Sequence, residues 1–78
     1  LQVPGIDVNA QDISGHTALM FAADRGHVVV VERLLQVPGI NVNAMNRDGR
    51  TALSYALSLN SPQKDAIIKL LRDRGATK

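Results

Sequence analysis

Two stretches of this 78-residue chain are almost identical and lie 34 positions apart. Residues 1–10 are LQVPGIDVNA and residues 35–44 are LQVPGINVNA, so that nine of the ten positions agree. Further pairs at the same offset are Gly15 and Gly49, Thr17 and Thr51, Ala18 and Ala52, Leu19 and Leu53, Phe21 and Tyr55, and Ala22 and Ala56. The Leu-Leu pair at 34–35 corresponds to 70–71, which indicates two extra residues near 60–62. The chain is therefore predicted to be a repeat array, in which each unit buries its apolar face against the next.

Each unit is predicted to contain a turn-rich loop followed by two short helices. A period of 34 also fits tetratricopeptide repeats, whose units are pairs of helices. In this chain, however, Pro38 and Gly39 would break such a helix, and the Asp48-Gly49 pair is typical of a hairpin turn. A turn combined with two helices therefore fits the sequence better.

In the first unit, Thr17 is predicted to cap a helix that continues to Ala23 and is ended by Gly26. The residues of this helix expected to face the core are Leu19, Ala22 and Ala23. A second helix is expected over 27–36 because apolar residues recur there at helical spacing. Its expected buried stripe is Val30, Val31, Leu34 and Leu35. The four valines at 28–31 favour a strand locally, but the surrounding periodicity is helical.

In the second unit, Thr51 is expected to cap the first helix. The second helix is predicted to have Ser61 as its N-cap and Pro62 at its first helical position, and to end at Gly75. Its expected buried stripe is Ala66, Ile67, Leu70 and Leu71.

These residues resemble the ankyrin repeat, whose pattern is close to D-x-x-G-x-T-P-L-H-x-A-A-x-x-G-H-x-E-I-V-x-x-L-L. Matching positions in the first unit are Asp12, Gly15, Thr17, Leu19, Ala22, Ala23, Gly26, His27, Val30, Val31, Leu34 and Leu35. Matching positions in the second are Gly49, Thr51, Leu53, Ala56, Leu70 and Leu71. The resemblance implies an all-α solenoid of hairpin loops and antiparallel helix pairs, with about two full repeats. It divides one domain, 1–78, into a leading loop (1–11), a repeat (12–44) and a C-terminal repeat (45–78).

Several positions depart from the family pattern or carry a further expectation. Met20 and Ser54 stand where the family has His, which implies that the usual hydrogen bond of that ring between repeats is lost. His27 matches the family's structural His, for which a packing role is expected. Leu1 resembles the last turn of a preceding helix, so the chain is expected to be a piece of a longer array or weakly stable. The open N-terminal face would then be available for self-association.

The resemblance implies a module that binds another protein through its hairpin tips and the inner face of its first helices. The candidate partner-binding residues are Gln11, Ile13, Ser14, His16, Asp24, Arg25, Met45, Arg47, Asp48, Arg50, Ser58 and Leu59. Of these, Ile13, Met45 and Leu59 are expected to be exposed although apolar. Three alternatives stay open: an architectural spacer of a longer array with no ligand of its own, an engineered or excised scaffold fragment, or a regulatory piece of an enzyme.

The composition argues against other classes of function. The chain has no Cys, which excludes disulfides and thiolate chemistry and favours a cytoplasmic or nuclear location. A net charge of +2, with basic and acidic residues interspersed, argues against nucleic acid as a partner. No apolar run approaches the roughly 20 residues of a membrane span. His16 and His27 lack the further ligands of a metal site, and no serine is matched with a base, so neither a cofactor nor enzyme activity is expected.

The resemblance also gives one candidate modification site. Leu1, Asp7 and Val8 precede Asn9 at the spacing found in ankyrin repeats whose Asn is hydroxylated, whereas Asn43 lacks the acidic residue. The alternative is a structural role, in which this Asn bonds to backbone groups in the turn between repeats.

Overall fold

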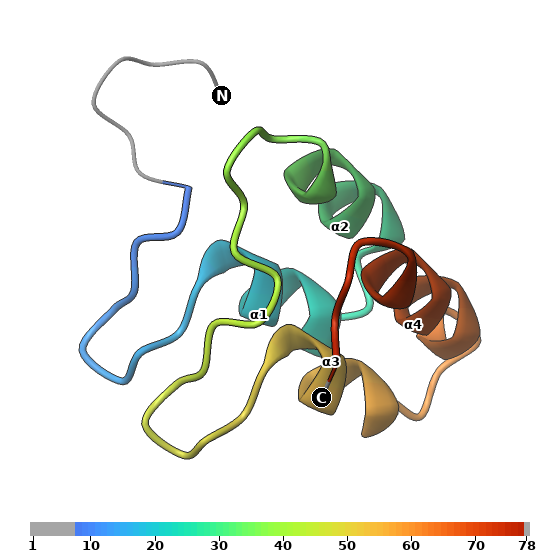
Figure 1. The fold of residues 1–78 in the computed structure, drawn as a ribbon. Helices are drawn as coiled ribbons and strands as arrows, with labels where there is room; N and C mark the ends of the chain where they lie inside the picture. The colour runs from blue at the N-terminus through green and yellow to red at the C-terminus, as the bar shows by residue number, and fades with distance from the viewer. Residues whose placement is uncertain (1–7, 78) are drawn as a thin grey trace.

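The computed structural model describes residues 8–77, and within that range it contains four α-helices and no strand. The helices are α1 (Ala18–Asp24), α2 (Val28–Leu35), α3 (Ala52–Leu57) and α4 (Lys64–Asp73). They form two antiparallel pairs, α1 with α2 and α3 with α4, stacked so that α1 lies against α3 and α2 against α4 (Figure 1). The loops that precede α1 and α3 extend together from one side of the helices (Figure 1). The predicted all-α repeat fold is confirmed.

The first helix of each repeat begins at the predicted threonine. Thr17 is extended, and its hydroxyl accepts a hydrogen bond from the Met20 N–H at 3.2 Å. Thr51 makes the same bond to the Ser54 N–H, and the Ser54 hydroxyl accepts in return from the Thr51 N–H. This reciprocal pair is a capping box, which satisfies two backbone donors that a helix start otherwise leaves unpaired. Gly26, at φ +71°, and Gly75, at φ +93°, follow the helices that they were predicted to end.

A single apolar core lies between the two layers of helices. Its buried members are Leu19, Met20, Ala22, Ala23, Val31, Leu34, Leu35, Ala52, Leu53, Ala56, Ile67, Leu71 and Ala76. Met20, which stands at the family's histidine position, is only 1% exposed and is among the largest fully buried side chains. The position therefore contributes packing in place of a polar link between repeats.

The buried stripes of α2 and α4 are narrower than predicted. Val30 is 45% exposed and Ala66 is also exposed, so the prediction that both are buried is wrong, while Leu70 is half-buried. At 3.6 residues per turn, Val30 lies about 100° around the helix from Val31. Only the face centred on Val31 is covered by α1 and α4, and Val30 therefore falls on its solvent edge.

The predicted start of α4, with Pro62 as its first residue, is wrong by two residues. The helix begins at Lys64, and residues 61–63 form a turn in which the Lys64 N–H donates to the Ser61 carbonyl at 3.2 Å. The Ser61 hydroxyl is buried and has no hydrogen-bond partner among the described residues. It lies beside Gly26, where a β-carbon would be 3.6 Å away, and no side chain caps the start of α4. Leu1 and residues 1–7 of the leading loop lie outside the described residues.

Candidate functional site

The hairpin of the first repeat, residues 11–16, is built around Asp12. One carboxylate oxygen accepts hydrogen bonds from the N–H groups of Ser14 and His16, both at 2.9 Å. The Gly15 N–H donates to the Asp12 carbonyl, and Gly15 has φ +84°, a conformation that glycine adopts without strain. The short, polar side chain of Asp12 therefore stabilises this turn by hydrogen bonds to its backbone.

The hairpin of the second repeat, residues 45–50, repeats this arrangement with Asn46 in place of Asp12. The Asn46 side-chain oxygen accepts from the N–H groups of Asp48 at 2.9 Å and Arg50 at 3.0 Å. Gly49 has φ +75° and donates to the Asn46 carbonyl. Asn46 is only 6% exposed, and its amide nitrogen is left to bond outside the turn.

The two hairpins are joined directly to one another. The Arg47 N–H donates to the Ser14 carbonyl at 3.0 Å, and the Gln11 side-chain amide donates to the Met45 carbonyl at 3.0 Å. The contact is closest at Gly15, where a β-carbon would lie 2.9 Å from the α-carbon of Asn46. These two hydrogen bonds and close packing thus hold residues 11–16 and 45–50 as one unit, which we call the hairpin platform.

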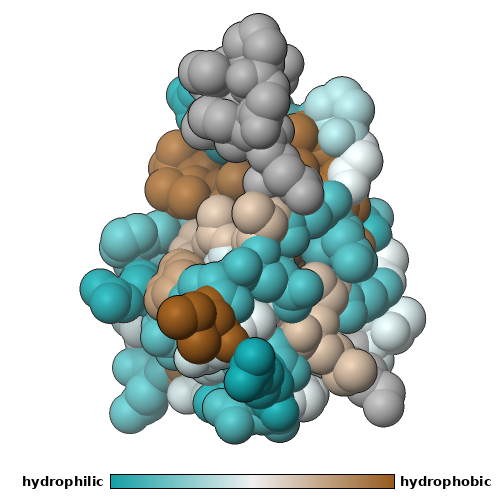
Figure 2. Space-filling view, turned by 90° about the vertical axis from the view of Figure 1, so that its left-hand side faces the viewer, coloured by the Kyte–Doolittle hydropathy of each residue, from teal (hydrophilic) through white to brown (hydrophobic). Residues whose placement is uncertain are grey.

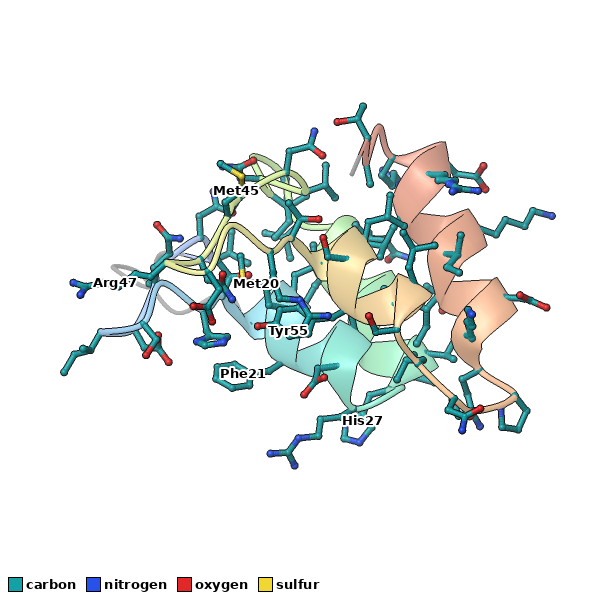
Figure 3. The ribbon with its side chains drawn as sticks, turned by 90° about the horizontal axis from the view of Figure 1, so that it is seen from below. Met20, Phe21, His27, Met45, Arg47 and Tyr55 are labelled. Carbon is teal, nitrogen blue, oxygen red and sulfur yellow. The ribbon has the colours of Figure 1, made fainter. Side chains whose placement is uncertain are left out.

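The tips of this platform carry exposed apolar side chains. Ile13 is 87% exposed and Met45 is 57% exposed, as predicted, while Arg47 and Asp48 are exposed beside them. On the side of the molecule that the hairpins occupy, hydrophobic surface is separated by hydrophilic residues (Figure 2). Arg47 projects away from the body of the protein (Figure 3). The platform therefore offers separate apolar contacts with charged groups between them.

Next to the platform, a cluster of rings joins the two repeats. His16 Nε2 lies 3.0 Å from the hydroxyl of Tyr55, and Asn46 donates to the same hydroxyl at 2.7 Å. The His16 ring stacks on Phe21 with centroids 5.1 Å apart, and the Arg50 guanidinium lies 4.1 Å from the centre of the Tyr55 ring. Phe21 and Tyr55 lie on the face formed by α1 and α3 (Figure 3). His16 thus makes a polar contact between the two repeats.

Both ring nitrogens of His16 lie close to polar groups. His16 Nε2 lies 3.0 Å from the Tyr55 hydroxyl, which accepts from Asn46, and 3.4 Å from the Asn46 amide nitrogen. The other ring nitrogen, Nδ1, lies 3.5 Å from a carboxylate oxygen of Asp12. The pKa of Asp12 lies below its ordinary value of 3.8, chiefly because the His16 backbone N–H donates to its carboxylate.

Most residues predicted to contact a partner are exposed. These are Gln11, Ile13, Ser14, Asp24, Arg25, Met45, Arg47, Asp48 and Ser58. His16 and Arg50 are half-buried, and Arg50 also donates to the Ser58 hydroxyl at 3.0 Å. The expected exposure of Leu59 is wrong, since this side chain is half-buried and packs against the core. His27 is exposed instead of packed, and its side chain makes no bond at the start of α2.

Three residues of the site were not predicted from the sequence. Phe21, Tyr55 and Asn46 bring the repeats together, and the available signal was that Phe21 and Tyr55 are aromatic at equivalent positions. Nothing in the sequence around Asn46 indicated that its amide would reach a ring nine residues later.

Asn9 and Asn43 each fix a loop of the array. The Asn9 side chain donates to the Gly39 carbonyl at 2.8 Å and accepts from the Asn41 N–H at 2.7 Å. Asn43 bonds in the same way to Gly75 and Thr77. These bonds to backbone groups agree with a structural role for both asparagines. Hydroxylation of Asn9 stays a prediction, and Leu1 and Asp7 of the hydroxylation pattern lie outside the described residues.

Among residues 8–77, no three His, Asp or Glu side chains form a group that would hold a metal ion. In the same range, no helix combines the length and apolar character needed to cross a membrane.

A search of curated proteins found no match. A family model described as ankyrin repeats (3 copies) matches residues 1–78, the full length of the sequence. The paired helices, the glycine-containing hairpins and the threonine caps agree with that match, and the chain belongs to the ankyrin-repeat family.

Proposed function

We propose that this chain is a protein-recognition module that binds its partner through the hairpin platform and the adjoining face of α1 and α3. Ankyrin repeats are generally protein–protein interaction modules and are typically non-enzymatic. The observation that carries the proposal is the exposure of Ile13 and Met45, at 87% and 57%, on hairpins joined by one backbone and one side-chain hydrogen bond. A surface already held in one conformation loses little entropy when a partner binds.

The chemistry of the platform indicates the kind of partner. Ile13 and Met45 favour apolar side chains, and the exposed guanidinium of Arg47 favours a carboxylate. Asp12 and Arg50 contribute less, because their charged groups already interact with His16 and Tyr55. The partner is therefore expected to present apolar side chains beside an acidic group.

We also propose the division into two repeats and the cellular location that the sequence predicts. The repeat 12–44 contains α1 and α2, and the C-terminal repeat 45–78 contains α3 and α4. An intracellular location, in the cytoplasm or nucleus, remains part of the proposal and rests on the absence of cysteine from the sequence.

Site-specific photo-crosslinking tests the proposal. A photoreactive amino acid at Ile13 or at Met45 should capture the same protein from cells, whereas the same group at exposed Lys69 on α4 should not. With that protein purified, Ile13→Asp and Arg47→Glu should each weaken binding by about tenfold or more while circular dichroism is unchanged. Val29→Asp is the matched control, because Val29 is 62% exposed and lies on α2.

The outcome also separates recognition from a spacer role. If the chain is a spacer, photoreactive groups at Ile13 and Met45 should not capture the same protein. Substitutions at Ile13 and Arg47 should then not weaken binding to any protein. Its only sensitive positions would be core residues such as Leu35 and Leu71, whose substitution lowers stability.

A further inference from the structure

The two methionines of the chain have opposite surroundings. The sequence contains no cysteine, so its sulfur chemistry is limited to Met20 and Met45. Met20 belongs to α1 and is 1% exposed within the apolar core, whereas Met45 belongs to the hairpin platform and is 57% exposed (Figure 3). Met45 is therefore the sulfur-bearing side chain that a dissolved oxidant reaches in the folded protein.

An exposed thioether reacts with a peroxide without the help of a catalytic group. A lone pair of the sulfur attacks one peroxide oxygen and the O–O bond breaks. The hydrogen on the transferred oxygen then passes to the departing hydroxide, so that water is released. The sulfur is oxidised by two electrons, the peroxide is reduced, and the product is methionine sulfoxide. A flexible apolar side chain thereby becomes polar and gains an oxygen that accepts hydrogen bonds.

The position of Met45 allows this change without loss of the fold. Its side chain belongs neither to the apolar core nor to the partly buried residues packed against that core. The group of Met45 that links the hairpins is its backbone carbonyl, which accepts from the Gln11 amide at 3.0 Å and is not altered by oxidation. At Met20, by contrast, a sulfoxide would place an unpaired oxygen in the core. An oxidised Met45 therefore remains on a folded platform.

Oxidation removes one of the two apolar contacts that the platform offers. These contacts are Ile13, at 87% exposure, and Met45, at 57%. Apolar surface favours binding in proportion to the area that it removes from water. A sulfoxide oxygen must also give up its bonds to water, and the apolar side chains of a partner offer no replacement. Ile13 and Arg47 are unchanged, so binding should weaken without being abolished.

We propose that Met45 is an oxidation site through which peroxides regulate binding at the hairpin platform, a regulation that rests on the proposed function. In the thioether state Met45 makes an apolar contact with the partner, and in the sulfoxide state that contact is lost. The change is reversible, because methionine sulfoxide reductases restore the thioether. In that step the sulfoxide oxygen leaves as water, and a dithiol supplies the two electrons and becomes a disulfide.

Oxidation of the isolated chain by hydrogen peroxide is the first part of the test. Mass spectrometry of proteolytic fragments measures how fast each methionine gains one oxygen. Met45 should react at least about tenfold faster than Met20 in the folded chain, because Met20 reacts only when the protein opens. In concentrated urea both should react at similar rates. Equal rates in the folded chain, or loss of the helical circular dichroism once Met45 is oxidised, would overturn the proposed regulation.

Photo-crosslinking from Ile13 is the second part and measures the effect on the platform. A chain with a photoreactive amino acid at Ile13 is treated with peroxide until Met45 is converted and Met20 is not. The protein that the untreated chain captures from a cell extract should then be captured about fivefold less or weaker still. Reductases for both sulfoxide stereoisomers, supplied with dithiothreitol, should restore capture. The same photoreactive group at Lys69 measures capture that does not involve the platform.

Two substitutions identify the sulfur that is responsible. Peroxide should not change capture by Met45→Leu relative to the same variant untreated, whereas Met20→Leu should lose capture as the wild type does. Undiminished capture after full oxidation of Met45, or an equal peroxide effect in Met45→Leu, would overturn the regulation and leave the proposed function intact. If the untreated chain captures nothing from Ile13, the proposed function fails, and the regulation fails with it.

Discussion

Gly15 and Gly49 occupy the same position in the two hairpins but have different surroundings. Both have positive φ, at +84° and +75°, which disfavours any residue with a β-carbon. A β-carbon on Gly49 would meet nothing within 4 Å, whereas one on Gly15 would lie 2.9 Å from the α-carbon of Asn46. A substitution at Gly49 therefore tests the strain of the turn backbone alone, whereas one at Gly15 also tests the packing of one hairpin on the other.

Alanine at these two positions should differ in effect. Gly49→Ala is expected to lower the free energy of unfolding by about 1 kcal/mol, from the left-handed backbone alone. Gly15→Ala must also push the hairpins apart and weaken the bond from Arg47 to Ser14, so its cost should be about 2 kcal/mol or more. Urea unfolding of both variants checks this, and equal effects would show that the hairpins are not packed as described.

The lowered pKa of Asp12 predicts how the free energy of unfolding depends on pH. Its pKa is lowered in the folded state, so its contribution is present above the unfolded value near 3.8 and is lost as pH falls through the lower folded pKa. Asp12→Asn should keep the turn, because Asn46 makes the same backbone bonds in the second hairpin. The variant should therefore lose less stability than the wild type as pH falls below 3.8.

Urea midpoints measured from about pH 6 to about pH 2.5 check the acid dependence. Asp48→Asn is the control, since the structure shows no hydrogen bond to the Asp48 carboxylate within residues 8–77. If Asp12→Asn and the wild type lose stability in parallel, the carboxylate does not hold the turn.

At the scale of elements, helix starts were predictable where the capping bond is local. Thr17 and Thr51 each bond to an N–H three residues ahead, which the sequence spacing by itself allows. At α4 the same reasoning failed for Ser61. Its hydroxyl lies beside Gly26 of the other repeat, a position that depends on how the two helix pairs stack.

Removal of the Thr51 hydroxyl and removal of the Ser61 hydroxyl should change stability differently. Thr51→Ala removes a capping bond and is expected to cost about 1 kcal/mol of stability. Ser61→Ala removes a buried hydroxyl without a partner and should be neutral or stabilising by up to about 1 kcal/mol. Urea unfolding measures both effects. A loss near 1 kcal/mol on Ser61→Ala would mean that Ser61 does cap α4 in solution.

At the scale of the whole molecule, a small core limits stability. The buried set consists of aliphatic residues and one methionine, and Phe21 and Tyr55, the two aromatic residues, lie outside it. A chain of this length buries only about 60% of the surface that it exposes when unfolded. The folded state is therefore held by few large side chains and by the contact between its two repeats.

The monomer is expected to unfold with a free energy below about 5 kcal/mol. Urea unfolding in dilute solution, at about 5 µM, measures this value without a contribution from association. A value well above 5 kcal/mol would contradict the prediction.

The sequence by itself determined the repeat, its helices, its turns and the exposure of Ile13 and Met45. These features depend on backbone preferences and on bonds between residues a few positions apart, which equal spacing in both units reveals. The tertiary structure alone decided which side chains the neighbouring repeat would cover. Val30 and Leu59 illustrate this, because the first falls beyond the edge of a packed face and the second is drawn against the core.

The link between repeats was decided in the same way. His16 meets Tyr55 across 39 positions, and Asn46 completes the contact only because the hairpins pack side by side. No local pattern encodes such a meeting, since it depends on the stacking of two helix pairs that are separate in sequence. The sequence pattern thus predicts the two repeats, whereas the packing of one repeat on the other determines which residues form the site.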